Sequence, residues 1–96
     1  MYEWDRNKND ENLRRHGLSF EDAAVVFGGP CLTFEDRRIA YGEERYITVG
    51  HLEGRLVVIA HTQRGRNTRI ISMRKANRRE ERAYEERLGA DRPDEG

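Results

Sequence analysis

The chain has one cysteine, two prolines and no long apolar run. A single cysteine cannot form an internal disulfide, and no cysteine or histidine pair has the spacing of metal ligands. No segment approaches the roughly 20 apolar residues of a membrane span, and residues 1–5 lack the pattern of a signal peptide. We therefore expect a cytoplasmic protein with a reduced thiol, no metal, no other cofactor and no membrane contact.

Apolar residues are also scarce, because only 35% of the 96 residues are hydrophobic and 38% are charged. A chain of this length forms one domain and buries about 60–65% of its unfolded surface. We expect a single domain over residues 1–89 and a disordered polar tail over residues 90–96. The core must be thin, so a partner that covers apolar surface would complement it.

A net charge is absent, since 18 Lys and Arg residues balance 18 Asp and Glu residues. The charges are nevertheless distributed unevenly. Residues 55–79 contain no acid but eight basic residues, which are Arg55, Arg64, Arg66, Arg69, Arg74, Lys75, Arg78 and Arg79. Such a segment creates a local positive field that suits nucleic-acid phosphates, although a solvated arginine-rich surface would have the same composition.

Capping residues predict three helices. Asp5 can cap a helix that ends at about His16, before Gly17. Ser19 can cap a short second helix, whose apolar stripe has helical spacing and which ends at residues 28–30. Asn77 begins a capping box for a third helix that runs to about residue 88, before a glycine at 89.

Alternating apolar residues predict strands at Cys31–Phe34, Tyr46–His51, Leu56–Thr62 and Thr68–Arg74. The last three are joined by short turns, which indicates an antiparallel meander. The predicted fold is therefore a compact α+β domain, with two N-terminal helices, a meander of three to four strands and a C-terminal helix.

This order predicts that basic residues meet at one rim of the sheet. His61 and Arg64 lie at the end of the central strand, Arg74 ends the last strand, and Arg78 and Arg79 begin the final helix. Guanidinium groups bind phosphate oxygens with two parallel hydrogen bonds, and a helix N-terminus adds backbone donors. The alternative is an arginine-rich face that only pairs with nearby glutamates.

Histidines and aromatic residues are further candidates. His61, close to the basic loop, suits proton transfer near neutral pH, whereas His16 can equally be explained by capping of its helix. Trp4 and Tyr84 could stack on RNA bases or pack in the core. The sequence has no nucleophile elbow, glycine-rich phosphate loop or paired-cysteine motif, which disfavours acyl transfer and nucleotide-dependent chemistry.

Several segments together resemble the BrnT family of type II toxins, which has the ribonuclease fold of RelE-like toxins. The matching residues span about 2–86 and include Trp4-Asp5, Lys8, Asn12 to Ala23, Gly42 to Tyr46, Arg69 to Ala76, Arg79-Glu80 and Tyr84-Glu85. The resemblance implies an endoribonuclease that arrests translation. It also implies neutralisation by a BrnA-type antitoxin, in a hetero-oligomer with more than one copy of each chain.

Metal-independent RNA cleavage needs a base, an acid and cations that stabilise the phosphorane. We expect Arg74 and Arg64 to provide the cations and His61 to transfer the proton, with Lys8, Glu44, His16 and Tyr84 as further candidates. The alternative is a non-catalytic RNA- or protein-binding module with the same basic surface. The residues expected to bind RNA are His16, Arg66, Arg69, Lys75, Arg78 and Arg79.

Overall fold

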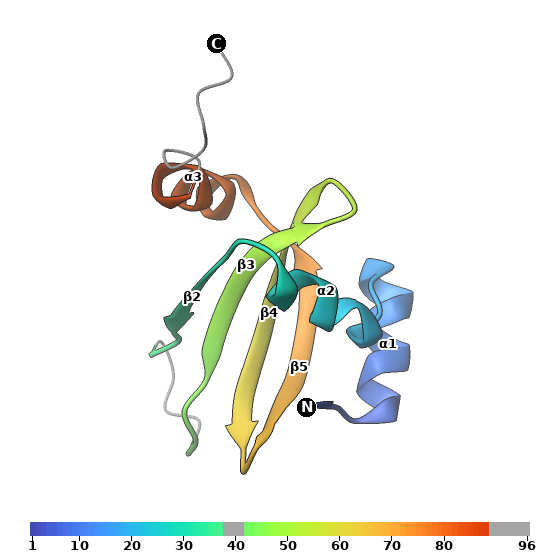
Figure 1. Cartoon of the computed structure of the whole chain (residues 1–96). Helices are drawn as coiled ribbons and strands as arrows, with labels where there is room; N and C mark the ends of the chain where they lie inside the picture. Colours follow the sequence, from blue (N-terminus) through green and yellow to red (C-terminus); the bar gives the residue numbers. More distant parts are fainter. Residues whose placement is uncertain (38–41, 89–96) are drawn as a thin grey trace.

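A computed structural model of the chain describes residues 1–37 and 42–88 (Figure 1). The predicted glycine stop at 89 and the tail at 90–96 lie outside the described residues. The elements follow one another as β1 (Tyr2–Glu3), α1 (Arg6–His16), the 3₁₀ helix η1 (Phe20–Asp22), α2 (Ala23–Gly28), β2 (Cys31–Glu35), β3 (Tyr46–Leu52), β4 (Arg55–Arg64), β5 (Asn67–Lys75) and α3 (Arg78–Arg87).

The five strands form one sheet in the order β1-β5-β4-β3-β2. The α+β class and the antiparallel meander from β2 to β5 are confirmed. The expectation of three to four strands is wrong, because β1 adds a fifth strand, parallel to β5, and the sheet does not match the expected RelE-like arrangement in full. Two residues are too few to show an alternating pattern, so the sequence does not reveal β1.

The helix ends form for the predicted reasons. The Asp5 carboxylate accepts hydrogen bonds from the backbone N–H groups of residues 7 and 8, at 2.8 and 3.3 Å. Gly17 ends α1 with a φ of 69°, a conformation that glycine adopts without steric cost. Asn77 and Glu80 form the reciprocal capping box of α3. Ser19 caps η1, which leads directly into α2.

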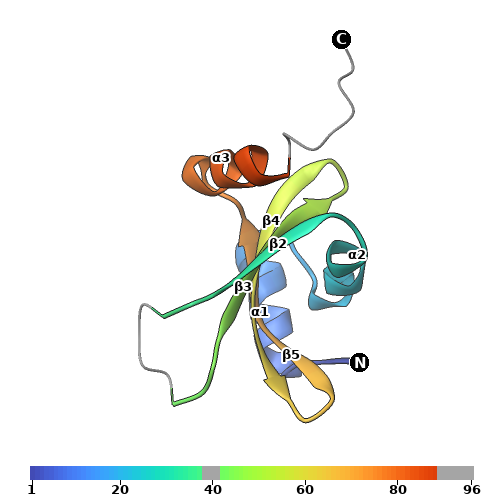
Figure 2. The same ribbon diagram turned by 60° about the vertical axis from the view of Figure 1, so that its left-hand side comes forward.

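The N-terminal helical segments cover one face of the sheet (Figure 2). Their buried side chains, such as Phe20 and Val26, pack on residues of β4 and β5. Gly50 of β3 permits the close approach of α2, because a Cβ atom there would lie 2.8 Å from Cγ1 of Val26. We call this the helix face; its buried core consists of Leu18, Phe20, Ala23, Val26, Leu52, Val57, Ile59, Ile70 and Met73.

The opposite face is covered only in part. Figures 1 and 2 show α3 across one end of the sheet, while no other helix of the described residues lies over this face. Tyr84 of α3 is 2% exposed and packs with Ile47, Val49 and Val58. Its hydroxyl donates to the backbone oxygen of Pro30 at 3.1 Å, which ties α3 to the start of β2. We call the remainder of this side the open face.

Asn12 explains how α1 attaches to the edge of β5. Its side chain is buried, although most of α1 is exposed. Nδ2 donates to the backbone oxygen of Leu18 at 2.9 Å, and Oδ1 accepts from the backbone N–H of Met73 at 3.1 Å. The strand β1 pairs with β5 only at residues 68 and 69 of β5. Farther along β5, the Asn12 side chain accepts the backbone N–H that a longer edge strand would otherwise bind.

We predict that Asn12→Ala lowers the free energy of unfolding by about 2 kcal/mol, because it leaves a buried backbone N–H and a carbonyl without partners. Urea unfolding followed by circular dichroism measures this change. Asn7→Ala is the matched control, since residue 7 is exposed, and it should change the stability by less than about 0.5 kcal/mol. Equal stabilities of the two variants would contradict the assigned role of Asn12.

Candidate functional site

Strand pairing determines which residues lie on the open face. Phe34 of β2 pairs with Ile47, Ile47 pairs with Ala60, and Ala60 pairs with Ser72 of β5. Directly paired residues in antiparallel strands lie on the same face of a sheet. The adjoining row of paired residues runs from Leu32 through Val49 and Val58 to Arg74.

A depression of about 180 Å³ lies in the middle of this face. We call it the central depression. Arg45 and Arg74 supply two cations, Asp36 supplies a carboxylate and Ser72 supplies a hydroxyl group. Its apolar floor consists of Ile47, Val58, Ala60 and Ile71. Two guanidinium groups beside a carboxylate and a hydroxyl can bind a phosphodiester and move a proton.

Arg74 is held firmly at the edge of the central depression. Its NH1 and NH2 groups donate to Oε1 and Oε2 of Glu80, at 2.8 and 2.7 Å. Glu80 Oε1 also accepts the backbone N–H of Asn77 at 2.8 Å, as part of the cap of α3. The side chain of Arg74 is still 39% exposed. The guanidinium group is therefore fixed in orientation and still accessible to a ligand.

Asp36, Arg45, Ser72 and Glu80 were missed as site residues in the sequence analysis. Asp36 is only 8% exposed, and its backbone N–H donates to the backbone oxygen of Arg45 at 2.8 Å. This bond extends the β2–β3 pairing and brings the two side chains to the central depression. The only indication in the sequence that Asp36 belongs to a site is its position directly after a strand. This indication is weak, because carboxylates are common at strand ends.

Two further depressions adjoin the central one. The first, of about 170 Å³, shares Asp36, Ile47 and Arg74 with it. The second, of about 250 Å³, shares Ile71 and Ser72. We call them the β2 depression and the α1 depression. The β2 depression is also lined by Phe34, Glu35, Arg37 and Glu80, and the α1 depression by Lys8, Glu11, Asn12, Arg15 and His16.

His61 lies away from this site. Alternation along β4 places it on the helix face, where it is 8% exposed and its ring contacts Phe27 and Tyr46. Nε2 shares a 2.7 Å hydrogen bond with Oγ1 of Thr48, which in turn contacts Oγ1 of Thr33 at 2.7 Å. Burial lowers the pKa of His61 from 6.5 to about 4. The expected position of His61 at the basic rim is therefore wrong.

Arg64 and Arg74 share the open face but not one rim, so the expected convergence is also wrong. Arg64 pairs with Asn67 at the β4–β5 turn, whereas Arg74 pairs with Val58. Six residues of β4 separate these positions, or roughly 20 Å at the rise of a strand. A hairpin brings neighbouring residues together at its turn, and Arg74 lies at the opposite end of β5.

The other basic candidates spread around this surface. Arg69 donates to Glu3 at 2.9 Å, and hydrogen bonds from Asn67 and Arg69 lower the pKa of Glu3. Arg66 is exposed in the β4–β5 turn, and Arg78 and Arg79 are exposed in the first turn of α3. Lys8 and His16 do lie together, in the α1 depression.

Tyr84 and Trp4 are not available for base stacking. Tyr84 is almost completely buried, and Trp4 packs edge-on against Phe20 with ring centroids 6.4 Å apart. Glu44 is exposed and accepts a 2.5 Å hydrogen bond from the hydroxyl of Tyr46, which raises the pKa of that tyrosine. The backbone oxygen of Glu44 accepts from Thr62 Oγ1. None of these residues lines the central depression.

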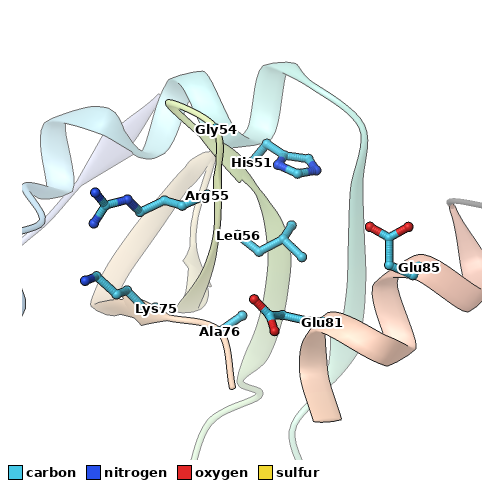
Figure 3. A pocket seen from close by; sticks show the side chains of 8 residues that line it. All are labelled: His51, Gly54, Arg55, Leu56, Lys75, Ala76, Glu81 and Glu85. Carbon is cyan, nitrogen blue, oxygen red and sulfur yellow. The ribbon is translucent and has the colours of Figure 1, made fainter. Parts of the chain in front are cut away.

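Figure 3 shows a different depression, of about 570 Å³, between the β3–β4 turn, the end of β5 and α3. Arg55 and Lys75 lie on one side of it, and Glu81 and Glu85 on the other (Figure 3). His51 contributes Nε2, a buried atom without a hydrogen-bond partner among the described residues. Two cations and two carboxylates cancel, so this depression suits a phosphate less well than the central one.

Within residues 1–37 and 42–88, no three histidine, cysteine or acidic side chains are placed to hold a metal ion. No helix in the described part of the chain is long and apolar enough to cross a membrane.

Comparison with known proteins supports the expected family. A family model described as the ribonuclease toxin BrnT of a type II toxin–antitoxin system matches residues 4–80. The match includes all four strands of the meander and every described residue that lines the central depression, Arg74 among them. No curated protein matches the chain.

We predict that His61 makes the fold sensitive to acid. Above pH 6.5 the ring is neutral in both the folded and the unfolded state. Between pH 6.5 and about 4 the unfolded chain takes up a proton that the folded chain excludes, so the free energy of unfolding falls, by at most about 3 kcal/mol. Urea unfolding at pH 7 and pH 4.5 measures the loss.

His61→Gln should have a smaller loss over the same pH interval, even though it is less stable at pH 7. His16→Gln, which changes an exposed histidine, serves as the control and should keep the loss of the parent protein. An unchanged pH dependence in His61→Gln would show that other groups cause the acid sensitivity.

Proposed function

Because the chain belongs to the BrnT family of ribonuclease toxins of type II toxin–antitoxin systems, we propose that it cleaves RNA on the open face of its sheet, without a metal ion. The observation that carries this proposal is the central depression, where Arg45 and Arg74 lie beside Asp36 and Ser72. The charges and hydroxyl that this reaction uses are thus gathered in one place.

Arg74 and Arg45 would bind the scissile phosphate. The bidentate contact with Glu80 fixes the plane of the Arg74 guanidinium before RNA arrives, so little orientational freedom is lost on binding. Arg45 is partly buried and is held by Glu43, with Nε and Oε2 3.3 Å apart. Both cations stabilise the negative charge that accumulates on the phosphorane, which is the largest catalytic term in such reactions.

Asp36 is the group that we propose as the base. Its carboxylate would take the proton of the 2′-hydroxyl while the 2′-oxygen attacks phosphorus. The bond from phosphorus to the 5′-oxygen then breaks, and the 5′-oxygen takes a proton from a water molecule. The hydroxide that remains takes the proton from Asp36, which restores the carboxylate. The products would be a 2′,3′-cyclic phosphate and a 5′-hydroxyl. This assignment replaces His61, which lies on the helix face.

The RNA strand would continue beyond the central depression over basic residues. On the side of α1, the α1 depression adjoins the central depression at Ile71 and Ser72. It provides the basic side chains of Lys8, Arg15 and His16. Arg64 and Arg69 lie farther along the same face, towards the β4–β5 turn. We propose that these residues, together with Arg66, Arg78 and Arg79, contact the RNA backbone, where each contact adds salt-dependent affinity. Lys75, which pairs with Val57 of the helix face and lines the depression of Figure 3, is left out of this path.

A type II toxin has an antitoxin as its partner. We propose that the partner is of the BrnA type, that the two proteins form a hetero-oligomer in the cytoplasm, and that RNA cleavage arrests translation until the antitoxin binds. The arginines of the open face would favour an acidic segment of the antitoxin. Added salt should then weaken the complex, because exposed charges are screened.

We predict that the purified chain cleaves naked RNA in the presence of EDTA, and that Arg74→Ala lowers the rate at least tenfold, on the order expected for loss of one transition-state contact. Gel analysis of the RNA gives the rate. Arg82→Ala, which removes an exposed arginine of α3 outside the described depressions, is the control and should cleave at nearly the parental rate.

Retarded but intact RNA, with folded protein and with ribosomes present, would instead establish a binding module. Loss of cleavage on EDTA addition, restored by a divalent cation, would contradict the metal-free mechanism.

We predict that Asp36→Asn lowers kcat by about a hundredfold or more, the range for removal of a general base, and changes KM little. The amide has the shape of the carboxylate but cannot accept the proton. Asp10→Asn, at an exposed acid of α1 that lines none of the described depressions, controls for the change in charge. Single-turnover cleavage, together with thermal unfolding to verify the fold, measures the effect. Equal kcat values for the parent and Asp36→Asn would remove Asp36 from the mechanism.

A further inference from the structure

We propose that the β2 depression binds one RNA base, and that Phe34 is the side chain on which this base stacks. The inference rests on the proposed RNA cleavage and adds a specificity-determining residue to it. Arg74 lines both the β2 depression and the central depression. A base in the first would therefore belong to one of the two nucleotides that are joined by the phosphate in the second.

Phe34 is more exposed than the other aromatic residues that the structure describes. The residue is 47% exposed, although it lies in a strand and pairs with the buried Ile47. Phe20 and Tyr84 are at most 2% exposed, and the rings of Tyr2 and Phe27 stack on each other with centroids 5.4 Å apart.

Among the described residues, no other ring lies against Phe34. An exposed ring beside a phosphate-binding arginine is the arrangement that single-stranded RNA recognition uses.

The polar rim of the β2 depression can read the edge of a base. Asp36 and Glu80 line it with carboxylate side chains, and Glu35 and Arg37 line it as an ion pair. Arg37 already donates to Glu35 at 3.0 Å, and Arg74 to Glu80. A carboxylate has about four acceptor positions for hydrogen bonds. Exocyclic amino groups are the donors that match them.

The β2 depression should therefore prefer adenine, cytosine or guanine to uracil, which has no amino group. Its volume of about 170 Å³ is on the scale of a single base. The carboxylates also disfavour a phosphate in this position, because charges of the same sign repel. This separates the roles of the two depressions: the central one holds the phosphate, and the β2 depression holds the base.

The test compares Phe34→Leu, which keeps the apolar surface but removes the ring, with Phe34→Tyr, which keeps the ring. Val25→Ala, at a 60% exposed residue of α2 on the helix-covered side, is the control for loss of exposed apolar surface. The ligands are short RNA oligonucleotides with one 2′-deoxy substitution that prevents cleavage. Fluorescence anisotropy gives Kd, and unsubstituted oligonucleotides give kcat/KM.

Phe34→Leu should weaken binding and lower kcat/KM about tenfold, in the range for loss of one base stack, whereas Phe34→Tyr and Val25→Ala should stay within about twofold of the parent. Replacing the recognised base by an abasic residue should weaken binding to the parent equally. The abasic replacement should weaken binding to Phe34→Leu little further, because this variant has already lost the stacking of the base on the ring. Replacing that base by uracil should weaken binding to the parent as well.

Parental Kd and kcat/KM values in Phe34→Leu would overturn this inference and leave the proposed function intact. If the parent binds RNA but never cleaves it, the proposed function fails, and the Kd values still decide whether Phe34 stacks on a base. Weaker antitoxin binding with unchanged RNA binding would also overturn the inference and assign Phe34 to a protein interface.

Discussion

The pairing of β4 with β3 on one side and β5 on the other determines the rest of the structure. It places Ile59 and Met73 against the N-terminal helices, and Ala60 and Ser72 on the opposite face. The helical segments before β2 seal the first face, whereas α3 covers only one end of the second. The uncovered part of the sheet is the surface on which the proposed chemistry takes place.

The contact between Arg74 and Glu80 connects this surface to the fold. Glu80 caps α3 through Asn77 and holds Arg74 with two hydrogen bonds, so the helix start and the guanidinium group are positioned together. Tyr84, one turn farther along α3, fixes the helix on the sheet from the other side. A short and highly charged helix thereby supports a precise site, because polar contacts supply what its small apolar surface cannot.

The small apolar content of the chain also explains why an interaction surface remains exposed. Two core clusters share the limited supply of large apolar side chains, one on each side of the sheet. Phe34 lies on the open face next to Arg74 rather than inside either cluster. In the proposed function the same face serves RNA and is the natural target for the antitoxin, so that one surface accounts for both activity and inhibition.

Sequence alone determined the local features: the capped ends at Asp5 and Gly17, the capping box at Asn77, the strands of the meander and the family. These depend on neighbouring residues or on a pattern within one segment. Tertiary structure decided the faces and the partners. Alternation along β4 shows that the strand has two faces but not which one the helices cover, so the burial of His61 was not predictable. Asp36, Arg45 and Arg74 meet only through the pairing of four strands, from β2 to β5.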